Sequence, residues 1–199
     1  YVVSVLTTLA FDARRSKFFS EELIYALKIV QNNQIEISKF RGSWAGAIGN
    51  FQFLPSTFSK YAVDGDGDGK IDLYNNMTDS FYSAANYLSK MGWKGDYKWG
   101  RPVSFNKNNK KIWDSIEARE WKKINYFSKL GIKTYNGAKL PIAPIDARLI
   151  APMGKDGPVF LVYENFKYII KWNASTNYAL SVGLLSDAIV AKTPIKLKK

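Results

Sequence analysis

The chain has 199 residues, 46% hydrophobic and 23% charged, which is enough to bury a core as one domain with a small insertion. It contains neither cysteine nor histidine, which excludes disulfides, thiol nucleophiles, Ser–His pairs and histidine metal sites, so catalysis would fall to carboxylates, lysine, tyrosine or a metal. The net charge of +12 attracts polyanions such as nucleic acid, anionic lipid or an acidic wall polymer, although scattered lysines favour a plain solvated surface.

The first half of the chain shows mainly helical periodicity, and no apolar run is long enough to span a bilayer. Residues 1–10 are typical of the end of a buried helix. Three further helices are expected at residues 13–31, 55–62 and 79–91, the last stopped by Gly92. The apolar faces expected for the two long helices are Phe18, Phe19, Leu23, Ala26, Leu27 and Val30, and then Phe81, Ala84, Ala85 and Leu88.

The second half mixes helix and strand signals. Residues 93–111 are expected to form a loop or a domain edge, and residues 112–130 show helical spacing. Segments 147–152 and 158–163 flank a Gly-Lys-Asp-Gly turn and predict a hairpin, and Phe166–Trp172 predicts a further strand. Asn173 or Ser175 caps a last helix at 178–191. The element order predicts an α+β fold.

Residues 64–72 form an Asp-rich loop with the spacing of an EF-hand calcium loop. Asp64, Asp66 and Asp68 stand at positions 1, 3 and 5, a glycine at position 6, and the Lys70 carbonyl at position 7. Position 12 is an asparagine instead of glutamate, so the last carboxylate is expected from Asp79. The alternative is a solvated acidic turn. A single such loop is expected to brace the fold rather than sense calcium.

Residues 42–53 form a glycine-rich loop. Ser43, Trp44, Asn50 and Gln52 are polar or aromatic groups set among glycines and alanines, which suits hydrogen bonding and stacking with a sugar. Tight helix packing with an exposed tryptophan explains the same composition. Tyr87, Trp172, Asn173 and Tyr178 offer similar groups, although each alone is as typical of a core aromatic or a helix cap.

Several motifs resemble the membrane-bound lytic murein transglycosylase B family. They are TLAFDARR with Phe18-Phe19, then GSWAGAIG followed by QFLPS, the Asp-rich loop, ANYL at residues 85–88 and WNASTNY at residues 172–178. The resemblance spans nearly the whole chain and is weakest at residues 100–150. It implies a mainly α lysozyme-like core with an EF-hand-like calcium loop. The chain is then expected to divide into three parts. Residues 1–97 form the first part of the core with the calcium loop, residues 98–160 form a small mixed or β insertion, and residues 161–199 form a strand and closing helix that return to the core.

The activity implied by this resemblance is cleavage of the MurNAc–GlcNAc β-1,4 bond of peptidoglycan without water. One glutamic acid protonates the leaving oxygen and then, as a base, helps the 6-hydroxyl close onto the anomeric carbon, giving a 1,6-anhydromuramyl end. That acid must stay protonated, which requires a desolvated pocket. The implied partners are peptidoglycan glycan strands, and the implied location is the periplasm. The protein is expected to be a monomer. An outer-membrane lipid anchor is an alternative that the residues of this chain do not reveal.

The resemblance also implies roles for individual residues. Ser43 and Gln52 line the cleft beside the catalytic acid, and Arg14 and Arg15 lie near the glycan or its peptide. Tyr87, Asn173 and Tyr178 contact the sugar, Trp172 holds an aromatic position, and the calcium ligands are Asp64, Asp66, Asp68, the Lys70 carbonyl and Asp79. No organic cofactor is implied.

The chain departs from the family at the catalytic glutamate, which the family carries upstream of the segment resembling residues 1–12. Glu21 and Glu22 fall where the family has an ordinary helix glutamate. Two explanations follow: a fragment, inactive alone, whose acid precedes Tyr1, or a peptidoglycan-binding module that does not cleave. The abrupt start within a helix favours the fragment. A basic nucleic-acid binder is a third hypothesis, but no RNA-binding signature is present and nucleic acid is not expected.

Overall fold

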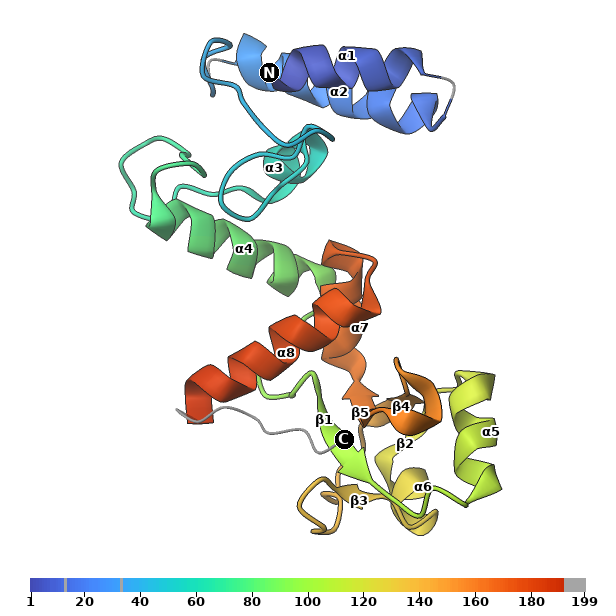
Figure 1. Ribbon diagram of the computed structural model, residues 1–199. Helices are drawn as coiled ribbons and strands as arrows, with labels where there is room; N and C mark the ends of the chain where they lie inside the picture. Colours follow the sequence, from blue (N-terminus) through green and yellow to red (C-terminus); the bar gives the residue numbers. More distant parts are fainter. Residues whose placement is uncertain (13, 33, 192–199) are drawn as a thin grey trace. The chain divides into compact units, whose positions relative to one another are not determined.

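The computed structural model describes residues 1–12, 14–32 and 34–191, and its contacts divide the chain into two compact units (Figure 1). The first unit comprises Tyr1–Met91 and the second begins at Gly92. Each has its own buried side chains, so each is described separately. The three-part division expected from the sequence stays a prediction.

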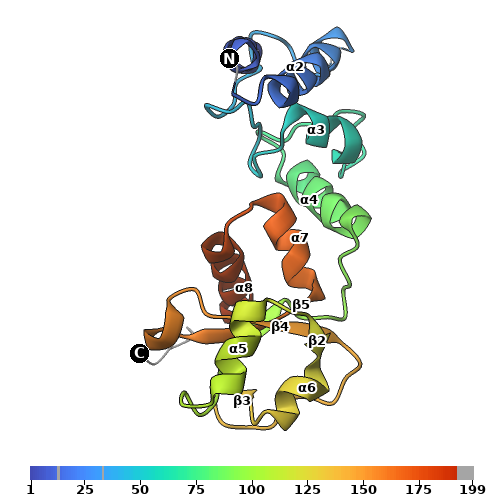
Figure 2. The same cartoon turned by 90° about the vertical axis from the view of Figure 1, so that its right-hand side faces the viewer.

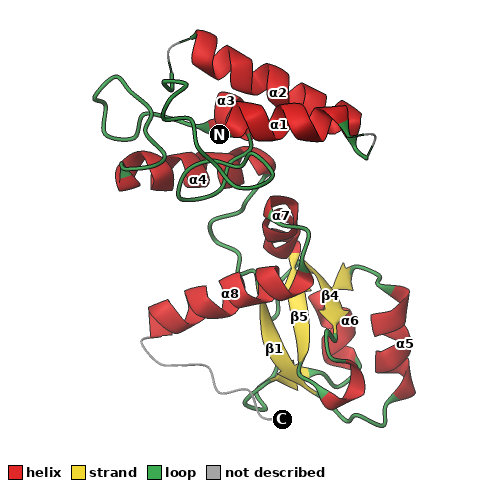
Figure 3. Ribbon diagram, turned by 45° about the horizontal axis from the view of Figure 1, so that its top comes forward, coloured by secondary structure: helices red, strands yellow, loops and turns green. Residues whose placement is uncertain are grey.

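The first unit is helical, as expected. Its helices are α1 (Val2–Phe11), α2 (Ser16–Gln31), α3 (Pro55–Tyr61) and α4 (Met77–Met91). α1 packs against α2, and α2 against α3 (Figure 3). The predicted start of the second helix, Ala13, lies outside the described residues. Leu6, Phe19 and Ile29 are buried between the helices, whereas Leu27, expected on the buried face, is half exposed.

The buried face of α4 differs from the expected one. Asp79, Ser80 and Ser83 are buried, whereas Phe81 is 58% exposed. The reason is hydrogen bonding: Ser83 Oγ accepts from Val63 N (2.9 Å), and Ser80 Oγ donates to Leu73 O (3.2 Å). The helix turns its polar side inward because the preceding loop presents backbone groups that need partners.

The second unit contains an antiparallel sheet of strand order β2-β4-β5-β1-β3. The strands are β1 (Gly100–Ser104), β2 (Lys122–Lys123), β3 (Lys133–Thr134), β4 (Asp146–Ile150) and β5 (Val159–Tyr163). The helices of this unit are α5 (Lys110–Ala118), α6 (Ile124–Lys129), η1 (Gly154–Asp156), α7 (Glu164–Trp172) and α8 (Thr176–Ala191). The predicted hairpin is confirmed as β4 and β5, paired from Ala147–Tyr163 to Ile150–Phe160.

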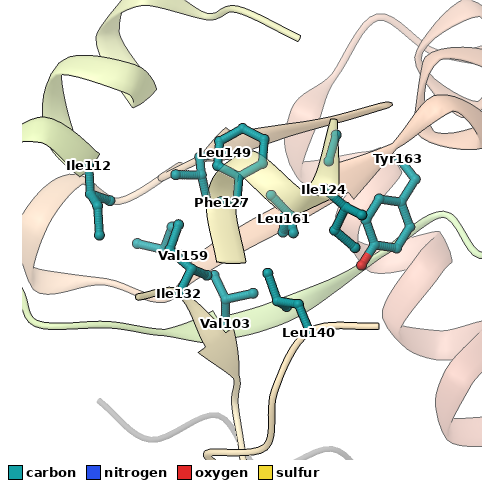
Figure 4. Packing of buried hydrophobic residues seen from close by; sticks show 11 residues of the cluster. Val103, Ile112, Ile124, Phe127, Ile132, Leu140, Leu149, Val159, Leu161 and Tyr163 are labelled. Atoms are coloured by element: carbon teal, nitrogen blue, oxygen red, sulfur yellow. The ribbon is translucent and has the colours of Figure 1, made fainter. Parts of the chain in front are cut away.

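Hydrophobic clusters cover both faces of this sheet, which lies between two sets of helices (Figure 2). On one face, Leu149 and Leu161 pack with Ile112 of α5 and Phe127 of α6 (Figure 4). The other face is covered by α7 and α8, and its cluster contains Trp99, Phe160, Val162, Phe166, Ile169, Ala179 and Leu180. This alternation of inward side chains fixes the register of the strands.

The prediction of a strand at Phe166–Trp172 is wrong, because this segment is helix α7. Asn165, Phe166 and Ile169 are its buried residues, at helical spacing. Asn165 also fixes the segment by hydrogen bonds to Lys94 and Tyr97, accepting from Lys94 N (3.0 Å) and donating to Tyr97 O (2.6 Å). The aromatic and β-branched residues of this segment, which are typical of strands, were the misleading signal.

The structure of the second unit decides two open predictions, the extent of the helix at residues 112–130 and the cap of the last helix. The helical spacing at residues 112–130 belongs to α5 and α6, separated by Arg119 in the left-handed conformation (φ 53°) and by strand β2. Of the two proposed caps for the last helix, Ser175 accepts from Tyr178 N (3.2 Å).

Candidate functional site

The glycine-rich loop is closed by a short antiparallel bridge between Ile48 and Phe53, with Ile48 N donating to Phe53 O (2.7 Å). Gly46 has φ 81°, and a Cβ there would lie 2.7 Å from the Leu6 side chain of α1. Only glycine meets both the backbone and the packing requirement. Glycine at this position therefore lets the loop lie directly on α1.

Ser43 is half buried at the start of this loop. Its Oγ accepts hydrogen bonds from the amides of Ala45 (3.3 Å) and Ala47 (3.1 Å). A serine hydroxyl has two acceptor lone pairs and one proton. Because the loop backbone uses the acceptor sites, Ser43 is left as a hydrogen-bond donor toward a ligand or a neighbouring carboxyl group.

Gln52 lies exposed at the opposite end of the loop, in the left-handed conformation with φ 55°. Its Nε2 donates to Gly49 O (3.1 Å), which fixes the side chain and leaves the amide oxygen as an acceptor. A residue with a Cβ adopts this conformation at a cost, and such strain concentrates at functional sites. The backbone therefore holds this polar group in a defined position.

Asn50 and Trp44 behave differently from each other. Asn50 is tied to the end of the Asp-rich loop, because its amide donates to Leu73 O (2.8 Å) and its Nδ2 to Tyr74 O (3.2 Å) and Ser80 Oγ (3.2 Å). These hydrogen bonds join the two loops. Trp44 is 82% exposed and remains an available stacking surface.

The Asp-rich loop gathers three carboxylates. One oxygen each from Asp64, Asp66 and Asp79 lie within 4.8 Å of one another, and Asp79 is fully buried. Two oxygens bound to one calcium ion at 2.3–2.6 Å lie at most about 5 Å apart, so this spacing fits a single ion. Asp68 falls outside this cluster, and its Oδ1 accepts from Lys70 N (2.8 Å).

Backbone amides hold these carboxylates in place. Asp79 accepts from Gly65 N and Asp72 N, both at 2.8 Å, so one buried side chain clamps both ends of the loop. Asp64 accepts from Gly67 N (2.6 Å) and Gly69 N (2.8 Å). The hydrogen bond from the Gly69 amide is the main cause that lowers the pKa of Asp64, which favours the charged form.

Asn76 is a residue of this site that the sequence reasoning missed. Its Nδ2 donates to Asp66 (2.7 Å), and its Oδ1 accepts from Thr78 N (2.9 Å) and Asp79 N (3.2 Å) at the start of α4. An asparagine three residues before an acidic residue at a helix start is a recognisable capping signal. That signal could have identified it.

The other predicted residues of the first unit are Tyr87, Arg14 and Arg15. Tyr87 packs on Phe53, next to Gln52, with ring centroids 6.0 Å apart, and burial raises its pKa, so it stays neutral. Both arginines are exposed at the turn between α1 and α2. The Arg15 guanidinium lies 4.5 Å from the centroid of the Phe18 ring, a cation–π contact.

Trp172, Asn173 and Tyr178 lie together in the second unit, on the connection between α7 and α8. Trp172 is half buried, Asn173 is exposed in an extended conformation, and Tyr178 is 38% exposed. The structure thus places the predicted sugar-contacting residues in two groups, one on each unit.

Comparison with known proteins identifies the class. The family described as "Transglycosylase SLT domain" matches residues 1–187, and the chain belongs to this family. A curated relative is the membrane-bound lytic murein transglycosylase B of Escherichia coli strain K12, 30% identical over 194 residues, which are 94% of this chain and 50% of the relative. The family expected from the sequence is confirmed.

Two solved structures are informative. SltB3 of Pseudomonas aeruginosa, in complex with NAG-NAM-pentapeptide, is 40% identical with a TM-score of 0.89, covering 95% of this chain and 50% of that one. Escherichia coli Slt35, in complex with calcium, is 28% identical with a TM-score of 0.79, covering 96% and 59%. The α+β class with a lysozyme-like core is confirmed. The chain spans about half the length of the curated relative it matches.

Proposed function

We propose that this chain forms part of a lytic transglycosylase that cuts the MurNAc–GlcNAc β-1,4 bond of peptidoglycan and leaves 1,6-anhydroMurNAc ends. The observation that carries the proposal is the glycine-rich loop, which presents a Ser43 donor and a strained Gln52 acceptor beside the Tyr87 ring. The complex of the similar protein SltB3 with NAG-NAM-pentapeptide supports a glycan substrate.

The catalytic acid in this proposal is a glutamate outside residues 1–199, as the family resemblance implies. Glu22 is an unsuitable candidate because its carboxylate accepts from Ser56 N (2.9 Å) and Ser56 Oγ (2.6 Å), and so caps α3. The 199-residue chain alone is therefore expected to bind glycan without cleaving it.

The reaction needs one proton donor and no water. The acid gives its proton to the leaving glycosidic oxygen as the bond to the anomeric carbon breaks. The resulting carboxylate takes the proton of the 6-hydroxyl as that oxygen bonds to the same carbon, and the substrate N-acetyl group stabilises the positive charge. In the first unit, Ser43 donates to the acid and orients it, and Gln52 and Tyr87 contact sugar, with Arg14 and Arg15 alongside. In the second unit, Asn173 and Tyr178 contact sugar, with Trp172 alongside.

A structural calcium ion forms part of the proposal, supported by the carboxylate spacing and by the calcium complex of Slt35. Asp64, Asp66 and Asp79 would hold the ion, and the Asp68 side chain and the Lys70 carbonyl remain predicted ligands. The ion would supply charge that offsets the repulsion among three carboxylates. Because Asn50 joins the two loops through Leu73, ordering the Asp-rich loop also steadies the loop that bears Gln52.

The location follows from the substrate. Glycan strands of the cell wall place the protein in the periplasm, and outer-membrane association and a monomeric state stay predictions. No helix among the described residues combines the length and apolar character needed to cross a membrane.

The test compares variants of the complete enzyme on purified peptidoglycan sacculi. Gln52→Ala and Ser43→Ala are each expected to lower turnover about 10- to 100-fold, because positioning of sugar or acid is lost, with the melting temperature changed by only a few degrees. Gln31→Ala, an exposed glutamine at the end of α2, is the matched control. Anhydro-ended muropeptides among the products establish the reaction type. Retention of sacculi without such products would instead support the binding-module alternative.

A further inference from the structure

The second unit contains a pocket that the proposed function does not use. It measures about 480 Å³ and is formed by the last turn of α5, by β4 with the residues after it, and by Thr176 at the start of α8. Figure 2 shows α5 beside β4. Arg119 and Arg148 line it, together with Glu117 and apolar side chains that include Ile116 and Pro152.

Within the part of the chain that the structure describes, neither arginine of this pocket forms an ion pair with a carboxylate. Among the same residues, the buried Nε of Arg148 has no hydrogen-bond acceptor. The nearby acids Glu120 and Asp146 instead pair with Lys122 (2.8 Å) and Lys123 (3.0 Å). A covered guanidinium without an acceptor is costly, which calls for an acceptor from outside the chain.

Both guanidinium groups belong to side chains that line the same pocket. Arg148 projects from the sheet with its guanidinium 5.4 Å from the Trp121 ring centroid, and Lys167 Nζ lies 4.0 Å from the same ring. Arg119 is fixed by the left-handed turn that ends α5. Burial and then the charge of Arg119 lower the pKa of Arg148, which reflects mutual repulsion of like charges. An anion bound between them would relieve it.

The geometry points to a binding site for the C-terminal carboxylate of a peptidoglycan peptide stem. Arginine forks bind carboxylates in a bidentate manner, and the apolar walls suit a small side chain such as that of alanine. Thr176 is the first residue of α8, between Asn173 and Tyr178 in the sequence, so the pocket and these two residues proposed to contact sugar belong to the same unit. A nucleic-acid backbone fits less well, because a recess with apolar walls accepts one terminal group rather than a polymer.

This inference rests on the proposed function, and its test separates the two. The 199-residue chain is titrated with GlcNAc-MurNAc-pentapeptide, with the same compound amidated at its C-terminus, and with GlcNAc-MurNAc without peptide, by calorimetry at fixed salt. Arg119→Gln with Arg148→Gln is expected to raise the Kd for the free-acid pentapeptide at least about tenfold and to leave the other two unchanged. Lys155→Gln, which removes one positive charge at an exposed position of this unit, is expected to change nothing.

Glu117→Gln supplies a readout that does not depend on the arginine variants folding. Removing this carboxylate from the pocket wall is expected to lower the Kd for the free-acid pentapeptide about two- to threefold. Equal binding of the acid and amidated pentapeptides, or equal losses with Lys155→Gln, would each overturn the inference. If GlcNAc-MurNAc itself fails to bind, the proposed function fails instead.

Discussion

Gln52 shows how a single residue combines strain with function. Its φ of 55° is unfavourable for any side chain that carries a Cβ, yet its amide is held by Gly49 at the end of the glycine-rich loop. The chain accepts the cost of a non-glycine residue at a position where glycine is the easier choice. A glutamine at this position is explained if its side chain contacts a ligand.

We predict that Gln52→Gly is more stable than Gln52→Ala by about 1 kcal/mol, although both lack the amide. Alanine retains the left-handed strain, and glycine removes it. Both variants are expected to show the same low turnover in the complete enzyme. Urea unfolding of the two variants measures the difference. Equal stability of the glycine and alanine variants would show that the loop relaxes and that strain at this position is negligible.

The sequence predicts some residues of the site better than others. Asp64, Asp66 and Asp79 come together as expected, because ligand spacing in a tight loop determines which side chains can converge. The bonds by which Asn50 joins two loops were not predicted, since they depend on where Leu73 and Ser80 lie. Bonds to residues distant in the sequence have no periodic signal, which explains why the sequence does not show this contact.

The sequence also predicts some helices better than others, depending on what each helix packs against. α2 and α8 were predicted from apolar spacing because their partners are other apolar surfaces. α4 buries its polar face, and α7 reads as a strand, because each is fixed by hydrogen bonds to loop backbone. Sequence periodicity therefore identifies an element when packing decides its orientation. It fails when a loop that needs hydrogen-bond partners decides instead.

The contact between the two loops of the first unit gives a prediction at this scale. Gly49 has φ 70°, and a Cβ there would lie 2.6 Å from both Cβ and O of Leu73. Gly67 has a similar φ of 79° with no atom within 4 Å of its Cβ position. Gly67→Ala thus reports the backbone cost alone, about 1 kcal/mol, whereas Gly49→Ala must also separate the loops.

Gly49→Ala is expected to lose at least about 3 kcal/mol of unfolding free energy, roughly 2 kcal/mol more than Gly67→Ala, because overpacking adds to the backbone cost. Urea unfolding in a chelator measures both variants without any contribution from metal. Similar losses for the two glycines would mean that the loops are not rigidly coupled, and would remove the link proposed between the ion and Gln52.

The whole molecule consists of two units that each bury a separate set of side chains. The Asp-rich loop and the glycine-rich loop both belong to Tyr1–Met91, whereas the sheet and its two hydrophobic clusters begin after Met91. This boundary was visible in the sequence only as a change of composition near residue 93. The sequence did not show which side chains the second unit buries, because its strands are short and pair with strands far away along the chain.

Calcium binding is therefore expected to affect the two units unequally. An ion held by Asp64, Asp66 and Asp79 stabilises only the unit that contains them, by about 2.7 kcal/mol when its concentration is 100 times its Kd. For a unit of this size the shift in melting temperature is roughly 10 °C. Scanning calorimetry in millimolar calcium, compared with a chelator, is expected to move one transition and leave the sheet-containing unit unchanged.

Two variants make this test specific to the loop. Asp64→Asn is expected to abolish most of the calcium-dependent shift, since one of the three converging carboxylates is lost. Asp114→Asn, an exposed acid on α5, keeps the full shift because it removes the same charge from the other unit. If the parent chain melts at the same temperature with and without calcium, or if Asp64→Asn responds like the parent, the Asp-rich loop is a solvated turn. Its carboxylates then brace the glycine-rich loop through backbone amides alone.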